Sequence, residues 1–284
     1  MSTTPNIAFF GTSRFAVIIL DVLRAHGILP ALIVTQPNRP QGRNLELLPS
    51  PAKIWATKHS IPVLQPETLT VKSEEKFRSA RYDLAIVASY GTIISKNILD
   101  LFPRGALNVH PSLLPKYRGA SPLQSAILAD DKDTGVTVIA LDEKMDHGPI
   151  VAVKRVTIKN WPPNTLELED TLATAGGDIL ATSIMPWLRG EIIAHAQDDG
   201  NATFTKKISK SDGELHLADA AYRNYLKIQA YTPWPGTYFF CERHGQKMRV
   251  KVTKASYRDG QLTIERIIPE GGHDMAYQDF LRNS

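Results

Sequence analysis

Three polar side chains in the middle of the chain have the chemistry needed to move an acyl group. Asn108 and His110 lie at the end of the apolar segment 106–109, and Asp146 follows the apolar segment 137–141. Acyl transfer to an amine needs a donor for the oxyanion, a group that accepts or relays the amine proton, and a fixed geometry. The Asn108 amide can serve the oxyanion. An imidazole exchanges protons near neutral pH, so His110 can hold or donate one, and Asp146 can orient the imidazole and take the amine proton.

The spacing of these residues indicates a shared site, although each also has a structural interpretation. Residues i and i+2 of a strand face the same way, so Asn108 and His110 share a face, and Pro111 then ends the strand. Ligands of open parallel sheets bind outside the carboxyl ends of the strands. Singly, Asn108 could cap a turn, His110 could be a structural histidine, and Asp146 could be an ordinary turn aspartate. Together with the apolar loop 112–122, they favour a catalytic site.

The first part of the chain alternates short apolar segments with helical patterns, which is typical of parallel strands joined by crossover helices. Strands are expected at 6–10, 29–34, 84–88, 106–109, 137–141 and 150–156, and helices at 15–23, 52–58 and 165–188. Ser50 is the expected N-cap of the second helix, with Pro51 at its first position. Residues 36–49, rich in Pro, Asn, Arg and Gly, are expected to form a loop. The pattern predicts an α/β fold.

The pattern changes after a polar stretch at 197–203, which indicates a linker. A helix is expected at 218–230, followed by alternating strands at 238–243, 248–253 and 262–267, as in a small β unit of barrel type. We therefore expect one domain at 1–190, a linker at 191–204 and a second domain at 205–284.

Composition indicates a soluble globular protein: 284 residues suit two domains, with 43% hydrophobic and 22% charged residues. No apolar run is long enough to cross a membrane, and the N-terminus lacks the pattern of a signal peptide. The single cysteine, Cys241, and histidines without ligand spacing predict no disulfide, no metal and a cytoplasmic location. Residues 1–204 carry equal numbers of acidic and basic side chains, so the net charge of +4 lies in 205–284. That excess fits a solvated surface or a platform for phosphate backbones.

The motifs around the candidate site resemble those of the folate-dependent formyltransferases. They are Asn108-Val-His110, Ser112-Leu-Leu-Pro115-Lys-Tyr-Arg-Gly119-Ala-Ser-Pro122, Thr134-Gly-Val-Thr137 and Asp146-His-Gly148. Within that family, the likeness to the methionyl-tRNA formyltransferases extends nearly end to end. It includes Phe10-Gly-Thr12, the loop 35–43, Pro49-Ser-Pro51, Ala88-Ser-Tyr-Gly91, Pro233-Trp-Pro-Gly236 and Phe280-Leu-Arg282.

The resemblance implies a Rossmann-like parallel-sheet formyltransferase domain followed by a small OB-like β-barrel domain. It also implies 10-formyltetrahydrofolate as the formyl donor and catalytic roles for Asn108, His110 and Asp146. The residues that it places at the folate are Ser112, Leu113, Leu114 and Pro115, with Ile86, Ala88 and Tyr90 around the pterin. The stretch 86–90 could equally be part of the hydrophobic core, with a purely structural role. Because few residues separate Tyr257 from Leu262, where relatives are longer, the barrel is expected to be truncated.

The Asn/His/Asp trio identifies the reaction, whereas the loop 36–43 and the C-terminal domain point to the acceptor. They imply initiator methionyl-tRNA, with Arg43 as a contact, although Arg43 lacks the lysines that usually follow it and could be a solvated arginine. We expect a monomer that binds tRNA and folate and no membrane. Two alternatives stay open. The acceptor could be glycinamide ribonucleotide or an amino-sugar nucleotide, or the chain could be a catalytically silent RNA-binding module.

Overall fold

The structure is a computed structural model that describes residues 5–41, 46–243 and 245–282. The chain forms two compact units. The first comprises 1–118, 135–156 and 170–204, and the second comprises 119–134, 157–169 and 205–284. The domain limits expected from the sequence stay a prediction.

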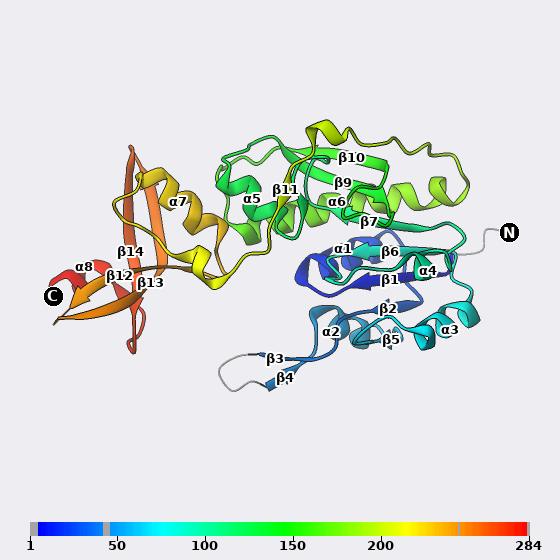
Figure 1. Cartoon of the computed structure of the whole chain (residues 1–284), viewed down its shortest axis with the longest axis horizontal. Coiled ribbons are helices and arrows are strands. Elements are labelled where there is room, and N and C mark those ends of the chain that lie inside the picture. Colours follow the sequence, from blue (N-terminus) through cyan, green and yellow to red (C-terminus); the bar gives the residue numbers. More distant parts are fainter. Residues whose placement is uncertain (1–4, 42–45, 244, 283–284) are drawn as a thin grey trace. The chain divides into compact units, whose positions relative to one another are not determined.

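The first unit contains a seven-stranded sheet in the order β10-β9-β7-β6-β1-β2-β5 (Figure 1). Its strands are β1 (Ile7–Gly11), β2 (Leu32–Val34), β5 (Val63–Leu64), β6 (Leu84–Ala88), β7 (Ala106–His110), β9 (Thr134–Ala140) and β10 (Ile150–Val156). Pairing is parallel from β5 through β2, β1 and β6 to β7, and β9 runs antiparallel to β7. From β1 the chain adds strands first on one side and then on the other. The predicted α/β fold is therefore confirmed.

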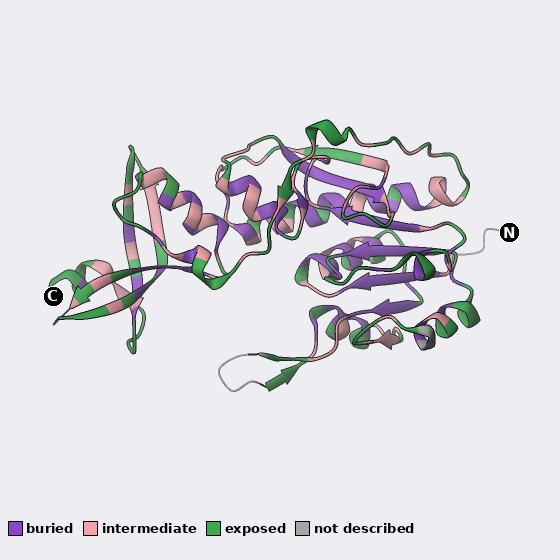
Figure 2. Cartoon of the chain, in the orientation of Figure 1, coloured by how far each residue is buried: buried purple, intermediate pink, exposed green. Residues whose placement is uncertain are grey.

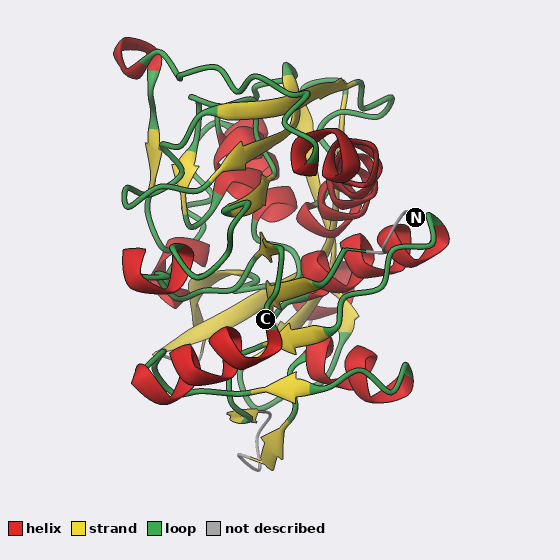
Figure 3. Ribbon diagram, turned by 90° about the vertical axis from the view of Figure 1, so that its right-hand side faces the viewer, coloured by secondary structure: helices red, strands yellow, loops and turns green. Residues whose placement is uncertain are grey.

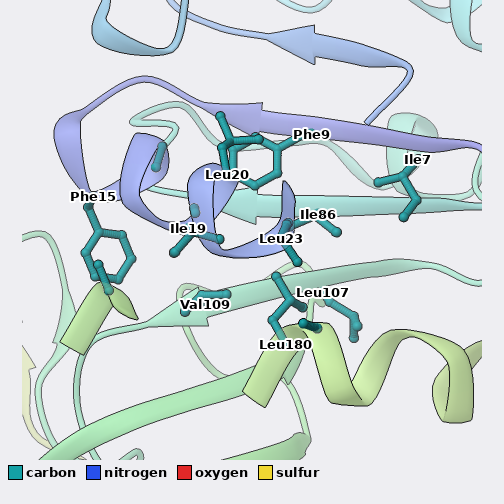
Figure 4. Close-up of a cluster of buried hydrophobic side chains, with 14 of the residues drawn as sticks. Ile7, Phe9, Phe15, Ile19, Leu20, Leu23, Ile86, Leu107, Val109 and Leu180 are labelled. Carbon is teal, nitrogen blue, oxygen red and sulfur yellow. The ribbon is translucent and has the colours of Figure 1, made fainter. Parts of the chain in front are cut away.

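Helices cover both faces of this sheet. They are α1 (Arg14–Ala25), α2 (Pro51–Lys58), α3 (Val71–Ala80), α4 (Lys96–Leu99) and α6 (Thr165–Leu188). One core cluster joins α1, α2 and α6 to one face, and Figure 4 shows Leu20, Leu107, Val109 and Leu180 within it. A second cluster joins α3 and α4 to the other face. The central strands are buried along their whole length, which explains their continuously apolar sequences (Figure 2).

The packing of α6 fixes the strand that carries the candidate site. A Cβ at Gly176 would lie 2.6 Å from Val109 Cγ1, so only glycine allows the helix this close to β7. Leu107 and Val109 belong to the cluster beneath α6. Alternation along β7 therefore turns Asn108 and His110 to the opposite face.

Local sequence signals account for several element boundaries. The Ser50 hydroxyl accepts a hydrogen bond from Lys53 N at 3.1 Å, which confirms it as the N-cap of α2. The expected limits of β6, β10 and α6 agree with the structure. The loop expected at 36–49 is wrong in part, because β3 (Arg39–Gln41) and β4 (Glu46–Leu48) pair there as an antiparallel hairpin. All of β4 is exposed, so it lacks the alternation of buried and exposed side chains that would identify a strand.

The second unit has a four-stranded antiparallel sheet in the order β12-β13-β14-β15. Figure 3 colours the strands of the chain yellow and its helices red. Its elements are α5 (Pro122–Leu128), α7 (Ala221–Ala230), β12 (Thr237–Arg243), β13 (Gln246–Arg258), β14 (Gln261–Pro269), β15 (Met275–Ala276) and α8 (Tyr277–Arg282). Asp259 and Gly260 both have positive φ and connect β13 to β14 in a two-residue hairpin. Within the described residues, this sheet has one strand fewer than a complete five-stranded barrel.

Short elements complete the chain: β8 (Arg118–Gly119), β11 (Phe204–Thr205), which pairs with β8, and 3-10 turns at Asp199–Asn201 and Lys210–Gly213. In the part of the chain that the structure describes, no helix is both long enough and apolar enough to cross a bilayer.

Candidate active site

The structure brings the three predicted catalytic side chains together in the first unit. Asp146 Oδ1 lies 3.4 Å from Asn108 Nδ2 and 3.6 Å from His110 Nδ1. The side chains of His110 and Asp146 are 6% and 16% exposed, so little water reaches the space between them. An amide, an imidazole and a carboxylate from positions up to 38 residues apart thus form one cluster.

The backbone around His110 decides which of its ring nitrogens exchanges a proton. Nε2 lies 2.9 Å from the carbonyl oxygen of Tyr117. A carbonyl can only accept, so Nε2 carries a hydrogen in both the neutral and the charged ring. Nδ1 is therefore the nitrogen that gains or loses a proton, and it is the one that faces Asp146.

Asp146 lies in a tight turn that needs a glycine. Its φ is +49°, a left-handed conformation that aspartate tolerates better than most residues do. Two positions on, a Cβ at Gly148 would lie 1.8 Å from the carbonyl oxygen of Ala140 at the end of β9. The missing side chain lets the turn pack against that strand end, which holds the carboxylate beside Asn108 and His110.

The predicted folate loop directly follows β7 and is held by Thr137. Thr137 Oγ1 donates to the carbonyl of Ser112 at 2.7 Å and accepts from the backbone N–H of Leu114 at 3.1 Å. The Ser112 hydroxyl donates to the carbonyl of Lys116 at 2.6 Å. The Ser112 hydroxyl thus closes the loop, while Leu113 and Pro115 are partly exposed. Thr137 was part of the sequence motif, but nothing in its type or spacing indicated this bonding role.

The side chains predicted to surround a pterin lie in the core. Ile86 and Ala88 are fully buried beneath one face of the sheet. Tyr90 is 3% exposed and packs edge-on against Phe10, with ring centroids 5.5 Å apart. Burial raises the pKa of Tyr90 to about 12. Contact between this stretch and a ligand would use backbone atoms, and the role of these three residues stays a prediction.

Arg118 and Gln197 form a polar link beside the site that the sequence did not indicate. Arg118 is 3% exposed, and its Nε and Nη2 donate to Gln197 Oε1 at 3.1 and 2.8 Å. Nη2 also donates to Asp199 Oδ1 at 2.7 Å. Chiefly through this bond, and with help from His147, Arg118 holds the pKa of the Asp199 carboxyl below its ordinary value. A polar, linker-like sequence gave no signal for Gln197.

Two further expectations concern acceptor and metal binding. Arg43, predicted to contact the acceptor, lies outside the described residues. Among the residues described, no group of three or more His, Cys, Asp or Glu side chains is arranged to hold a metal ion.

Comparison with known proteins identifies the family. Residues 5–184 match the family model described as formyl transferase, and residues 207–261 match the one described as formyl transferase, C-terminal domain. The chain belongs to the formyl transferase family. This formyl transferase is 40% identical over 271 residues to the methionyl-tRNA formyltransferase of Chloroflexus aggregans, covering 94% of this chain and 86% of that protein.

Solved structures share the fold of this formyl transferase. A methionyl-tRNA formyltransferase from Clostridium thermocellum is similar with a TM-score of 0.60 at 15% identity, covering 96% of this chain and 99% of that one. A sugar N-formyltransferase from Shewanella sp FDAARGOS_354 is similar with a TM-score of 0.62 at 18% identity, covering 86% and 96%. Because the two TM-scores are nearly equal, the fold does not distinguish between acceptors.

Proposed function

We propose that this formyl transferase moves the formyl group of 10-formyltetrahydrofolate to the free amino group of initiator methionyl-tRNA. The observation that carries the proposal is the 40% identity, over 94% of the chain, to a protein named methionyl-tRNA formyltransferase. The cluster of Asn108, His110 and Asp146 supports it, because these groups meet the three needs of acyl transfer to an amine. We further propose that the chain acts as a monomer in the cytoplasm, where aminoacylated tRNA is used.

Each member of the cluster has a separate task in the reaction. The amine nitrogen bonds to the formyl carbon, the bond from that carbon to the folate nitrogen breaks, and the proton lost by the amine is balanced by one gained by the folate nitrogen. The Asn108 amide carries two hydrogens, so it can bond to Asp146 and also donate to the oxyanion. Asp146 accepts the amine proton and passes it on to the folate nitrogen as the bond from that nitrogen to the formyl carbon breaks. A proton held on His110 Nδ1 stabilises the negative charge of the intermediate.

The residues beside the cluster suit a folate, which joins a polar pteridine edge to apolar ring faces. Leu113 and Pro115 present apolar surface directly after the polar end of β7. Ser112 and Leu114 shape the loop through their bonds to Lys116 and Thr137. We propose that residues 112–115 contact the folate with side chains and backbone, and that the stretch 86–90 contributes backbone only.

The second unit carries a surface that suits an RNA backbone. Along β12 and β13, one face carries Tyr238, Phe240, Lys247, Arg249 and Lys251, here called the basic–aromatic strip. The acidic Glu242 lies on the same face, opposite Lys247. Arg249 Cζ lies 3.8 Å from the centroid of the Tyr238 ring, and Lys247 Nζ lies 4.2 Å from that of Phe240. The other face of the strands is apolar core. Exposed cations held over rings can pair with phosphates, so we propose that this strip and Arg43 contact the tRNA.

A competition between acceptors tests the proposal. The enzyme receives labelled 10-formyltetrahydrofolate with equal concentrations of methionyl-tRNA, free methionine, glycinamide ribonucleotide and an amino-sugar nucleotide. We expect the label to appear on methionyl-tRNA. Label on a small molecule alone would contradict the proposed acceptor, and no transfer to any amine would contradict the proposed reaction.

A further inference from the structure

The segment 195–203, here called the strap, is bonded to β10 at one end and to the loop after β7 at the other, and it contacts the candidate site between them. His195 and Ile150 exchange backbone hydrogen bonds at 2.7 and 2.9 Å. At the other end, Thr203 Oγ1 accepts from the backbone N–H of Tyr117 at 2.8 Å, and the carbonyl of Thr203 accepts from Arg118 N at 2.9 Å. The strap therefore has a defined path along the first unit.

Gln197, near the middle of the strap, reaches the turn that carries Asp146. Its Nε2 donates to the backbone carbonyls of Asp146 and Gly148 at 2.9 and 2.8 Å. Its Oε1 accepts both bonds from Arg118. Turning the amide over would set its nitrogen against a guanidinium and its oxygen against two carbonyls, so the partners fix its orientation. Both hydrogens of the amide nitrogen are used on the Asp146 turn.

The same strap also supports the residue that orients His110. The Tyr117 carbonyl accepts from His110 Nε2, and the Tyr117 N–H is bonded to Thr203 of the strap. Tyr117 has a φ of +61° and Asp146 a φ of +49°, so both residues adopt a conformation that costs free energy and must be held by their surroundings. The hydrogen bond to Thr203 holds Tyr117, and the two hydrogen bonds from Gln197 hold the turn at Asp146.

We propose that Gln197 is a positioning residue that keeps Asp146 in register with Asn108 and His110, with Arg118 as its buried anchor. The inference rests on the proposed function, because it assigns Gln197 a role in the reaction of that site. Without the Gln197 amide, the backbone carbonyls of Asp146 and Gly148 lose the two hydrogen bonds that hold their left-handed turn. The Asp146 carboxylate then moves away from His110 Nδ1. Displacements of about 1 Å in a catalytic group can lower a rate by about 100-fold.

The test uses Gln197→Glu in the full-length enzyme. Glutamate keeps the size of the side chain and can still accept from Arg118, but it cannot donate, and its oxygens would oppose the carbonyls of Asp146 and Gly148. We expect kcat for formyl transfer to fall by about 10- to 100-fold. The KM for the formyl donor should change less than about twofold, and the melting temperature should fall by no more than about 5 °C, which is the cost of the two lost hydrogen bonds.

Ile193→Ala is the control, since Ile193 lies two residues before the strap and is 80% exposed. It should have the wild-type kcat. A wild-type kcat in Gln197→Glu would overturn the inference, and so would a fall in kcat accompanied by equal losses of donor affinity and thermal stability. If the wild-type enzyme itself formylates no amine, the proposed function has failed instead. A structure of the variant gives a second readout: the distance from Asp146 Oδ1 to His110 Nδ1 should exceed the 3.6 Å of the wild type.

Discussion

The proton chemistry of the site depends on the backbone as much as on the three side chains. The Tyr117 carbonyl commits His110 Nε2 to a hydrogen bond and so leaves Nδ1 to exchange protons. Asp146 faces that nitrogen only because its own turn is left-handed and packed against β9. A residue type alone therefore does not define the function here. The hydrogen bonds and the packing that hold each residue in place also determine which chemistry it can perform.

Gly148→Ala tests how closely the Asp146 turn must pack. The added Cβ would lie 1.8 Å from the Ala140 carbonyl, so the turn must move away from the strand end. We expect kcat to fall by about 100-fold and the free energy of unfolding to fall by about 1–3 kcal/mol. Gly272→Ala is the matched control, because its Cβ meets no atom closer than 3.3 Å. Wild-type kinetics in Gly148→Ala would show that the turn does not position the carboxylate.

Tyr90 is expected to make the free energy of unfolding of the first unit fall as the pH rises above 10. Burial raises the pKa of Tyr90 to about 12 in the folded protein, above the ordinary value of 10.0. A raised pKa means that the folded state keeps its proton longer, so this contribution is complete below pH 10 and is lost as the pH rises through 12.

Tyr90→Phe keeps the packing on Phe10 and removes the ionisable group. In urea titrations from pH 9 to 12, the free energy of unfolding of the wild type should fall more steeply than that of the variant, by up to about 1.4 kcal/mol per pH unit. Parallel curves for the two proteins would contradict the prediction.

At the scale of single elements, the start of α2 depends on one hydroxyl. Ser50 Oγ accepts from Lys53 N and is also bonded to Thr35 Oγ1 at 2.7 Å in a buried position. Ser50→Ala should lower the free energy of unfolding by about 1–2 kcal/mol, measured by urea denaturation. Thr57→Ala, at an exposed position of the same helix, should change it by less than about 0.5 kcal/mol. If the two substitutions lowered the free energy of unfolding equally, the Ser50 cap would not be what stabilises the start of α2.

Long elements with a clear apolar pattern were predictable, and short or polar ones were not. The short helices α4 and α5 were missed although both bury apolar side chains. The strands β6 and β10 and the helix α6 follow from periodicity and length. The hairpin of β3 and β4 was missed because β4 is exposed along its whole length and so shows no buried face. The helix α3 was also missed, because its sequence is mostly polar and its boundary depends on a capping box of Thr70 and Ser73.

The same distinction applies to the site. Asn108 and His110 were predictable because strand alternation and Pro111 place them at the end of β7. Asp146 was predicted from its place after an apolar segment and from the motif resemblance, whereas its convergence on the other two needed the structure. Gln197 could not be found from sequence, since its role arises from contacts with residues about 50 and 80 positions away within a polar segment.

At the scale of the whole molecule, the excess of basic residues in 205–284 should appear in tRNA affinity. We expect the dissociation constant for tRNA to rise steeply with salt, because cations displaced from phosphates favour binding at low salt. Arg249→Gln, in the basic–aromatic strip, should lower the slope of log affinity against log salt by about 1. Lys58→Gln, on an exposed position of α2, should leave the slope unchanged. An unchanged slope in Arg249→Gln would exclude this strip from the tRNA interface.

The single-turnover rate of formyl transfer in Asp146→Asn tests the role of the cluster most directly. The substitution keeps the shape of the side chain and removes the carboxylate that we propose accepts the amine proton. We predict that the rate falls by about 1000-fold or more, while the dissociation constant of 10-formyltetrahydrofolate changes less than about threefold. A variant that transfers the formyl group at the wild-type rate would show that Asn108, His110 and Asp146 do not act as one catalytic cluster.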